Sequence, residues 1–166
     1  MGSGIIKMIQ KAETKRKESK DEIQTFLAKL KYSIKSGSVK LNFQKERNVD
    51  QGRNKKYTNR YTIGLLFPDE DEIEALKREL SHLTVEEYLE TVKDTRFPER
   101  SEMRVFGKQY FGDDVYIKLR VELMSIAHST GDNFILVMSF HFSEWDFKEV
   151  DFPFRKNRGE LNEYNK

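Results

Sequence analysis

Apolar residues recur at three- and four-residue spacing over residues 21–35, which is the period of one helix face. They are Ile23, Phe26, Leu27, Leu30 and Ile34. The spacing predicts an amphipathic helix that ends at Gly37, because glycine adopts left-handed dihedrals without strain. Residues 39–44 instead alternate apolar and polar side chains, which predicts a short strand.

Two later segments carry the signature of a capping box. In this motif the side chain of the residue at the helix start accepts a hydrogen bond from the backbone amide of a Glu three residues later, and the Glu side chain accepts one from the backbone amide of the first residue. The first pairs Asp69 with Glu72 and the second pairs Thr84 with Glu87. They predict two further helices, the second running to about Asp94. The acidic run at the first start is interpreted as a helix N-terminus rather than a metal site, because the helix dipole favours carboxylates there.

Three further strands are predicted at residues 103–111, 113–126 and 133–142, with a hairpin turn at 129–132. Residues 45–61 have no period and are predicted to form a loop. The order of elements predicts an α+β fold, with an N-terminal helix and two further helices packed on a small, mainly antiparallel sheet.

The length of 166 residues fits one domain. We expect a flexible or helical basic extension over residues 1–20, a single α+β domain over 21–155 and a flexible tail over 156–166. Without cysteine there is no disulfide and no thiolate metal site, which fits a cytoplasmic location. No apolar run approaches the roughly 20 residues of a membrane span, so no membrane partner is expected.

Charge is divided unevenly along the chain. Residues 1–60 hold 16 basic and 6 acidic side chains, whereas residues 61–166 hold 14 and 22. This asymmetry indicates a polyanion partner, or an acidic region within the fold that faces the basic one, or solvated charges distributed by chance. If the partner is single-stranded RNA, the side chains expected to bind it by charge and stacking are Arg53, Lys55, Lys56, Tyr57, Arg60 and Lys108.

The polar face of the predicted strand 113–126 displays Tyr116, Lys118, Arg120 and Glu122. The apolar pattern of the hairpin predicts a register in which His128 pairs with Asn133. That register places Arg120 opposite His141, Lys118 opposite Ser143, and Tyr116 near Trp145. The polar groups would therefore converge on one face of the sheet.

These residue types suffice for metal-independent RNA cleavage, which needs a base for the 2′-hydroxyl, an acid for the leaving oxygen and cations for the charged transition state. His141 is either a neutral imidazole hydrogen-bonded at a sheet end or a proton-transfer group whose pKa nearby cations lower. The candidate catalytic residues are Tyr116, His141, Arg120, Lys118 and Arg104. The sequence has no HExxH motif and no phosphate-binding GxxxxGK[ST] loop, so neither a metal nor another cofactor is expected.

An amphipathic helix running into SGSVKLN, then TIGLL, LSHLTVEEYLETV, DVYIKLRV and ILVMSFHF, resembles the MqsR family of bacterial toxins. These are small messenger RNA endonucleases that resemble the RelE fold and are held inactive by an antitoxin. The family's strand tyrosine falls on Tyr116, and a lysine near the end of its last strand falls on His141. Its glutamine falls near Met103 or Arg104 and its helical lysine on Leu89, so neither is matched.

The resemblance implies a cytoplasmic endoribonuclease toxin whose partners are RNA and a cognate antitoxin protein. It leaves ribosome dependence open. The alternative is a noncatalytic RNA-binding or protein-binding module on the same fold. In that alternative Tyr116 lines a groove, and Lys118 and Arg120 contribute affinity rather than catalysis.

Overall fold

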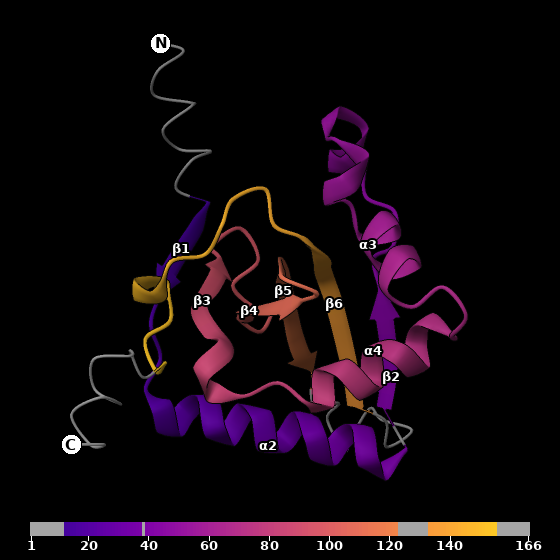
Figure 1. The fold of residues 1–166 in the computed structure, drawn as a ribbon. Coiled ribbons are helices and arrows are strands. Elements are labelled where there is room, and N and C mark those ends of the chain that lie inside the picture. Colours follow the sequence, from indigo (N-terminus) through magenta and orange to yellow (C-terminus); the bar gives the residue numbers. More distant parts are fainter. Residues whose placement is uncertain (1–11, 38, 123–132, 156–166) are drawn as a thin grey trace, which may run out of the picture.

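The computed structural model describes residues 12–37, 39–122 and 133–155 (Figure 1). The predictions for residues 1–11, for the turn at 129–132 and for the tail at 156–166 lie outside this part. The described helices are α2 (Lys20–Ser36), α3 (Asn59–Leu66) and α4 (Glu72–Ser81). The strands are β1 (Glu13–Arg16), β2 (Val39–Phe43), β3 (Tyr88–Asp94), β4 (Met103–Tyr110), β5 (Asp113–Glu122) and β6 (Asn133–Phe142).

The strands form one sheet in the order β1-β3-β4-β5-β6-β2. The sheet is mixed, because β2 runs parallel to β6 while the other neighbouring pairs are antiparallel. The predicted α+β class is confirmed, with three helices among the described residues. No helix in this part of the chain is long and apolar enough to cross a bilayer.

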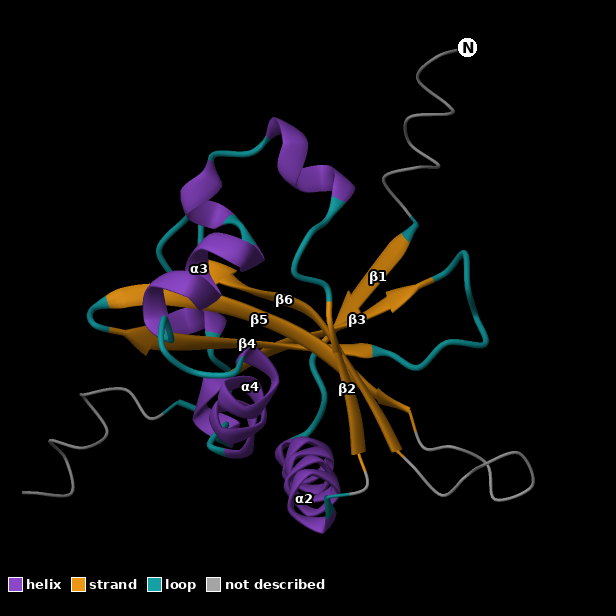
Figure 2. Cartoon of the chain, turned by 90° about the vertical axis from the view of Figure 1, so that its right-hand side faces the viewer, coloured by secondary structure: helices purple, strands orange, loops and turns teal. Residues whose placement is uncertain are grey.

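The two faces of the sheet are buried by different elements. Helices α2 and α4 lie on one side, as Figure 2 shows, and cover the larger core, which includes Phe106, Ile117 and Phe140. On the other face a smaller cluster around Val105 packs against the segment that follows β6. We call residues 143–155 the strap.

The predicted first helix is confirmed as α2. Ser19 and Glu22 form a capping box at its start, and Gly37 ends it at a φ of 75°. Strand β1 was not predicted: the flexible or helical extension expected over residues 1–20 is wrong for Glu13–Arg16, which pairs with β3. All four side chains of β1 are exposed, so no apolar alternation indicates the strand.

A buried ion pair holds the segment between β1 and α2 against the sheet. Glu18 is only 4% exposed and accepts two hydrogen bonds of 2.8 Å from Arg104 in β4 and one of 2.5 Å from Thr91 in β3. Burial alone would raise the pKa of this carboxyl, but the bonds from Arg104 and Thr91 hold it below its usual value. Charge therefore fixes a segment that hydrophobic patterning does not identify.

The helix predicted to run from Thr84 to Asp94 is wrong. The Thr84–Glu87 capping box exists, but it caps only the 3₁₀ turn η3 (Val85–Glu87), and the chain then enters β3. A bulge after Tyr88 interrupts the alternation of this strand. Tyr88 and Thr91 consequently share a face, with their hydroxyls 2.6 Å apart. A bulged strand thus produces the three-residue spacing that otherwise indicates a helix.

The segment predicted as a loop over residues 45–61 contains two 3₁₀ turns, η1 (Asn48–Gly52) and η2 (Lys55–Tyr57), and the first residues of α3. The helix expected from Asp69 begins later, because Asp71 is the residue whose side chain caps α4. Figure 1 shows α3 beyond the end of β2. This position brings α3 beside the second half of β6.

Candidate functional site

The β5–β6 register differs from the predicted one by four residues at its centre. Tyr116, not Arg120, pairs with His141, and Lys118 pairs with Ser139. Side chains alternate with a period of two, so a shift by an even number leaves Tyr116 and Lys118 on the expected face. The predicted proximity of Tyr116 and Trp145 is confirmed, with ring centroids 6.2 Å apart.

Tyr116 and His141 stack with their ring centroids 5.4 Å apart and their planes at 23°. His141 is 9% exposed, whereas Trp145, which contacts Tyr116 edge-on from the strap, is 59% exposed. The strap can approach this closely because β4 carries Gly107 opposite Tyr116, and a ring carbon of Phe147 lies 2.6 Å from where a β-carbon on Gly107 would stand. The pair of stacked rings is the centre of the candidate site.

The backbone sets the tautomer of His141. Its Nδ1 lies 2.9 Å from the carbonyl oxygen of Phe142. A carbonyl only accepts, so in the neutral ring Nδ1 carries the proton and Nε2 keeps its lone pair. Burial lowers the pKa of His141 below its usual value, and the charges of Arg53 and Arg47 lower it further. The imidazole is therefore a neutral base at pH 7.

Tyr116 has the opposite character. Burial, assisted by the charges of Glu90 and Glu13, raises its pKa to about 12, so the phenol stays protonated. Neither its hydroxyl nor His141 Nε2 has a hydrogen-bond partner among the described residues. Among the described residues, Arg120 Nε is the only polar side-chain atom that lacks both solvent contact and a hydrogen-bond partner. The Tyr116 hydroxyl and His141 Nε2 also lack a partner, so both must have some contact with solvent. The stacked rings thus present an unpaired proton acceptor and an unpaired proton donor, neither of them fully sealed from solvent.

The predicted cations of β5 do not converge on this pair. Lys118 lies 3.5 Å from Glu13 and is largely buried. A bulge after Lys118 places Arg120 opposite Leu136, and Arg120 itself lies about 13 Å along β5 from Tyr116. Its Nε stands 3.4 Å from Glu122 without hydrogen-bond geometry.

Arg104 and Lys108 lie on the other face of the sheet. Arg104 pairs with Leu119 in the register, bonds Glu18 and stacks its guanidinium 4.8 Å from the ring centre of Phe26. Lys108 pairs with Val115 and approaches the ring of Tyr110. The structure therefore separates both residues from Tyr116 and His141.

Two arginines of the 45–61 segment, rather than the predicted cations, contribute positive charge that acts on the Tyr116–His141 pair. The charge of Arg53 lowers the pKa of His141, and the Arg53 Nε lies 3.2 Å from Glu144 in the strap. Arg47, which the sequence reasoning missed, lowers the pKa of both Tyr116 and His141. It is half-buried and has no ion pair with any described carboxylate. Nothing in its local sequence indicates this position.

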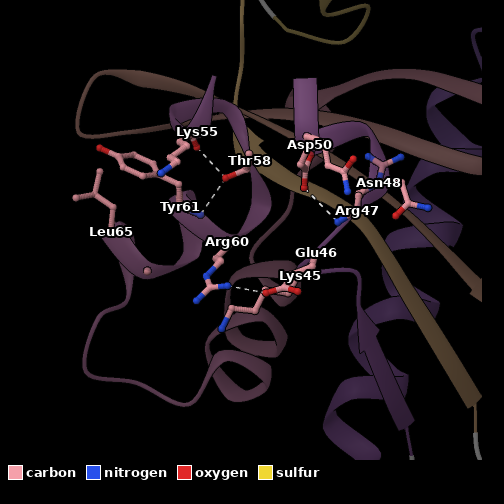
Figure 3. A pocket seen from close by; sticks show the side chains of 12 residues that line it. Lys45, Glu46, Arg47, Asn48, Asp50, Lys55, Thr58, Arg60, Tyr61 and Leu65 are labelled. Carbon is pink, nitrogen blue, oxygen red and sulfur yellow. Dashed lines mark hydrogen bonds and ion pairs between the residues drawn. The ribbon is translucent and has the colours of Figure 1, made fainter. Parts of the chain in front are cut away.

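A groove of about 1150 Å³ opens beside Arg47, between residues 45–51 and 55–65 (Figure 3). Lys55 and Arg60, both predicted to bind RNA, line this groove. Lys56 and Tyr57 do not; Lys56 is exposed and Tyr57 packs partly into the larger core.

Two buried polar residues fix α3, one wall of the groove, to β6. The Asn59 amide donates to the carbonyl oxygens of Gln44 and Met138 and accepts from the Phe140 amide. The Thr62 hydroxyl accepts from the Phe142 amide. These bonds satisfy backbone amides and a carbonyl of β6 beyond the point where its pairing with β2 ends. Helix α3 therefore takes the place of a neighbouring strand along this part of β6.

Comparison of the chain with known protein families, with curated proteins and with solved structures finds no match.

Proposed function

We propose that this chain is a metal-independent endoribonuclease in which His141 is the base and Tyr116 the acid. The observation that carries the proposal is the stacked pair itself. One ring offers an open lone pair and a lowered pKa, and the other offers an open hydroxyl and a raised pKa. Neighbouring groups whose pKa values are moved apart are typical of general acid–base catalysis.

In the proposed step His141 Nε2 takes the proton of a ribose 2′-hydroxyl, and that oxygen attacks the adjacent phosphorus. The bond from phosphorus to the 5′-oxygen breaks, and the leaving oxygen takes the Tyr116 proton. The products are a 2′,3′-cyclic phosphate and a free 5′-hydroxyl. Transfer of the proton from His141 to the Tyr116 phenolate, through water, restores both groups.

Arg47 supplies positive charge for the developing phosphorane. It has no described carboxylate to neutralise it and acts on both rings. Loss of one donor aimed at such developing charge slows catalysis by about 10²- to 10³-fold. Arg53 is the second candidate, although Glu144 and Asp50 partly neutralise it.

The resemblance of DVYIKLRV and ILVMSFHF to the MqsR toxins supports messenger RNA as the substrate. It extends the proposal to a RelE-like toxin that acts in the cytoplasm and is neutralised by an antitoxin. Growth arrest on induced expression, relieved by the product of a neighbouring small gene, tests this part. Normal growth at high expression contradicts it.

The chemistry is tested on a long single-stranded RNA in the presence of EDTA. Wild type is expected to leave 2′,3′-cyclic phosphate ends, and His141→Asn and Tyr116→Phe are each expected to cleave at least about 100-fold more slowly. His82→Asn and Tyr32→Phe are matched controls, because both side chains are exposed and stand outside the site. Thermal unfolding checks that every variant folds.

A noncatalytic RNA-binding module is the second candidate. It is favoured because the pairing of Lys118 with Glu13 removes a cation from the proposed catalytic set, whereas the groove lined by Arg47 and Lys55 can still bind RNA. RNA binding without cleavage, also in the presence of ribosomes, supports this candidate and refutes the endoribonuclease.

A further inference from the structure

We propose that the groove between residues 45–51 and 55–65 binds the single-stranded RNA that flanks the reacting phosphate, with Tyr61 stacking on one base. The link to cleavage rests on the proposed function, but binding in the groove does not. The proposal follows from where the groove opens, from its size and charge, and from the faces of α3.

The groove lies at the edge of the sheet, beside the half of β6 that carries His141. Arg47 lines it and also acts electrostatically on the rings of Tyr116 and His141. Tyr61, on the opposite wall, contacts Phe142 edge-on with ring centroids 6.5 Å apart, and Phe142 follows His141 in β6. Consecutive side chains of a strand point to opposite faces, so Tyr61 and His141 lie on different sides of β6. Arg47 links the two, and RNA that leaves the reacting phosphate would pass Arg47 at the edge of the sheet to enter the groove.

Size and charge indicate an extended anion. The volume of about 1150 Å³ exceeds the roughly 300–1,000 Å³ of typical small-molecule sites. Four basic side chains line the groove against two acidic ones. Lys45 and Arg60 are paired with carboxylates, which leaves Arg47 and Lys55 without an acidic partner among the described residues. Two free cations match the phosphates of a short stretch of backbone.

The wall formed by α3 favours unpaired bases. Tyr61 and Leu65 are one helical turn apart, both line the groove, and Tyr61 is 44% exposed. Phe142 contacts the Tyr61 ring edge-on, and the Asn59 and Thr62 bonds hold the helix in place. A fixed, half-exposed aromatic ring stacks on a base whose face is free, which a duplex does not offer.

The test measures equilibrium binding of the full chain to a fluorescent 2′-O-methyl RNA strand, which cannot undergo 2′-hydroxyl attack. Tyr61→Ala is expected to weaken binding roughly 5- to 150-fold, the effect of losing one stacked base. Lys55→Glu is expected to weaken binding and to reduce its salt dependence by about one phosphate contact. Tyr32→Ala and Lys31→Glu, at exposed positions of α2, are the matched controls and should bind as wild type does.

The proposal is overturned if both groove variants bind the RNA strand with wild-type affinity. It is also overturned if wild type binds an RNA duplex as tightly as the single strand and Tyr61→Ala does not weaken that binding. The two proposals fail separately. If Tyr61→Ala loses binding while wild type cleaves no RNA, the groove stands and the endoribonuclease fails. If wild type cleaves through His141 while the groove variants bind normally, the chemistry stands and the groove assignment fails.

Discussion

The strap packs closely on β4 at Gly107, and this packing requires that residue 107 have no side chain. A β-carbon there would lie 2.6 and 2.8 Å from two ring carbons of Phe147 and 3.1 Å from one of Phe152. Real β-carbons do not approach other atoms to 2.6 Å, so in Gly107→Ala the Phe147 ring or the backbone beside it must shift. Overpacking of this kind costs about 1–3 kcal/mol. For a chain of this size we expect Tm to fall by roughly 2–10 °C.

The change is measured by thermal unfolding and by the fluorescence of Trp145, the only tryptophan in the chain. Trp145 lies two residues before Phe147 and contacts Tyr116, so its emission should change when the strap moves. In a double-mutant cycle, Phe147→Ala removes the colliding ring, and Gly107→Ala should then cost at least about 1 kcal/mol less than it does in wild type.

Gly64→Ala is the matched control. No atom stands within 4 Å of the position that a β-carbon on Gly64 would take in α3, and alanine favours a helix by about 0.5–1 kcal/mol over glycine. This variant should be as stable as wild type or more so. If Gly107→Ala is neutral whether Phe147 is present or absent, the close approach does not hold the strap in place.

Three further results are expected. Because the folded state holds the pKa of His141 below its unfolded value, stability should fall as pH drops from about 6.5 through the lowered pKa, and His141→Asn should remove this part of the dependence in urea unfolding. Glu18→Gln leaves Arg104 without its buried partner and should cost about 3–5 kcal/mol in the same assay. Arg47→Ala should slow RNA cleavage by about 10²- to 10³-fold, whereas Arg100→Ala, which removes an arginine stacked on Phe97, should not.

Each of these has a contradicting outcome. An unchanged pH dependence in His141→Asn means that the imidazole does not resist protonation in the folded state. A cost below about 1 kcal/mol for Glu18→Gln means that the ion pair does not hold the segment before α2. Equal cleavage by the two arginine variants removes Arg47 from the proposed mechanism.

Local pattern predicted α2 well, because its period, its start and the glycine at its end agree. The same reasoning failed at β3, where a bulge gives Tyr88 and Thr91 the spacing of a helix. It also missed β1, whose side chains are all exposed and which joins the sheet by backbone pairing with β3. Pattern reasoning works where one element buries one face and fails where pairing with distant strands decides the conformation.

The sequence alone determined that Tyr116 and Lys118 share a face, because alternation along one strand is a local property. Only the tertiary structure decided which partners meet them there. The register of β5 and β6 pairs Tyr116 with His141, and with the bulge in β6 it pairs Arg120 with Leu136 instead. Anchoring of α3 by Asn59 placed the groove beside them. Arg47 reaches this site from a segment without any period, because contacts between distant parts of a chain depend on how its elements pack.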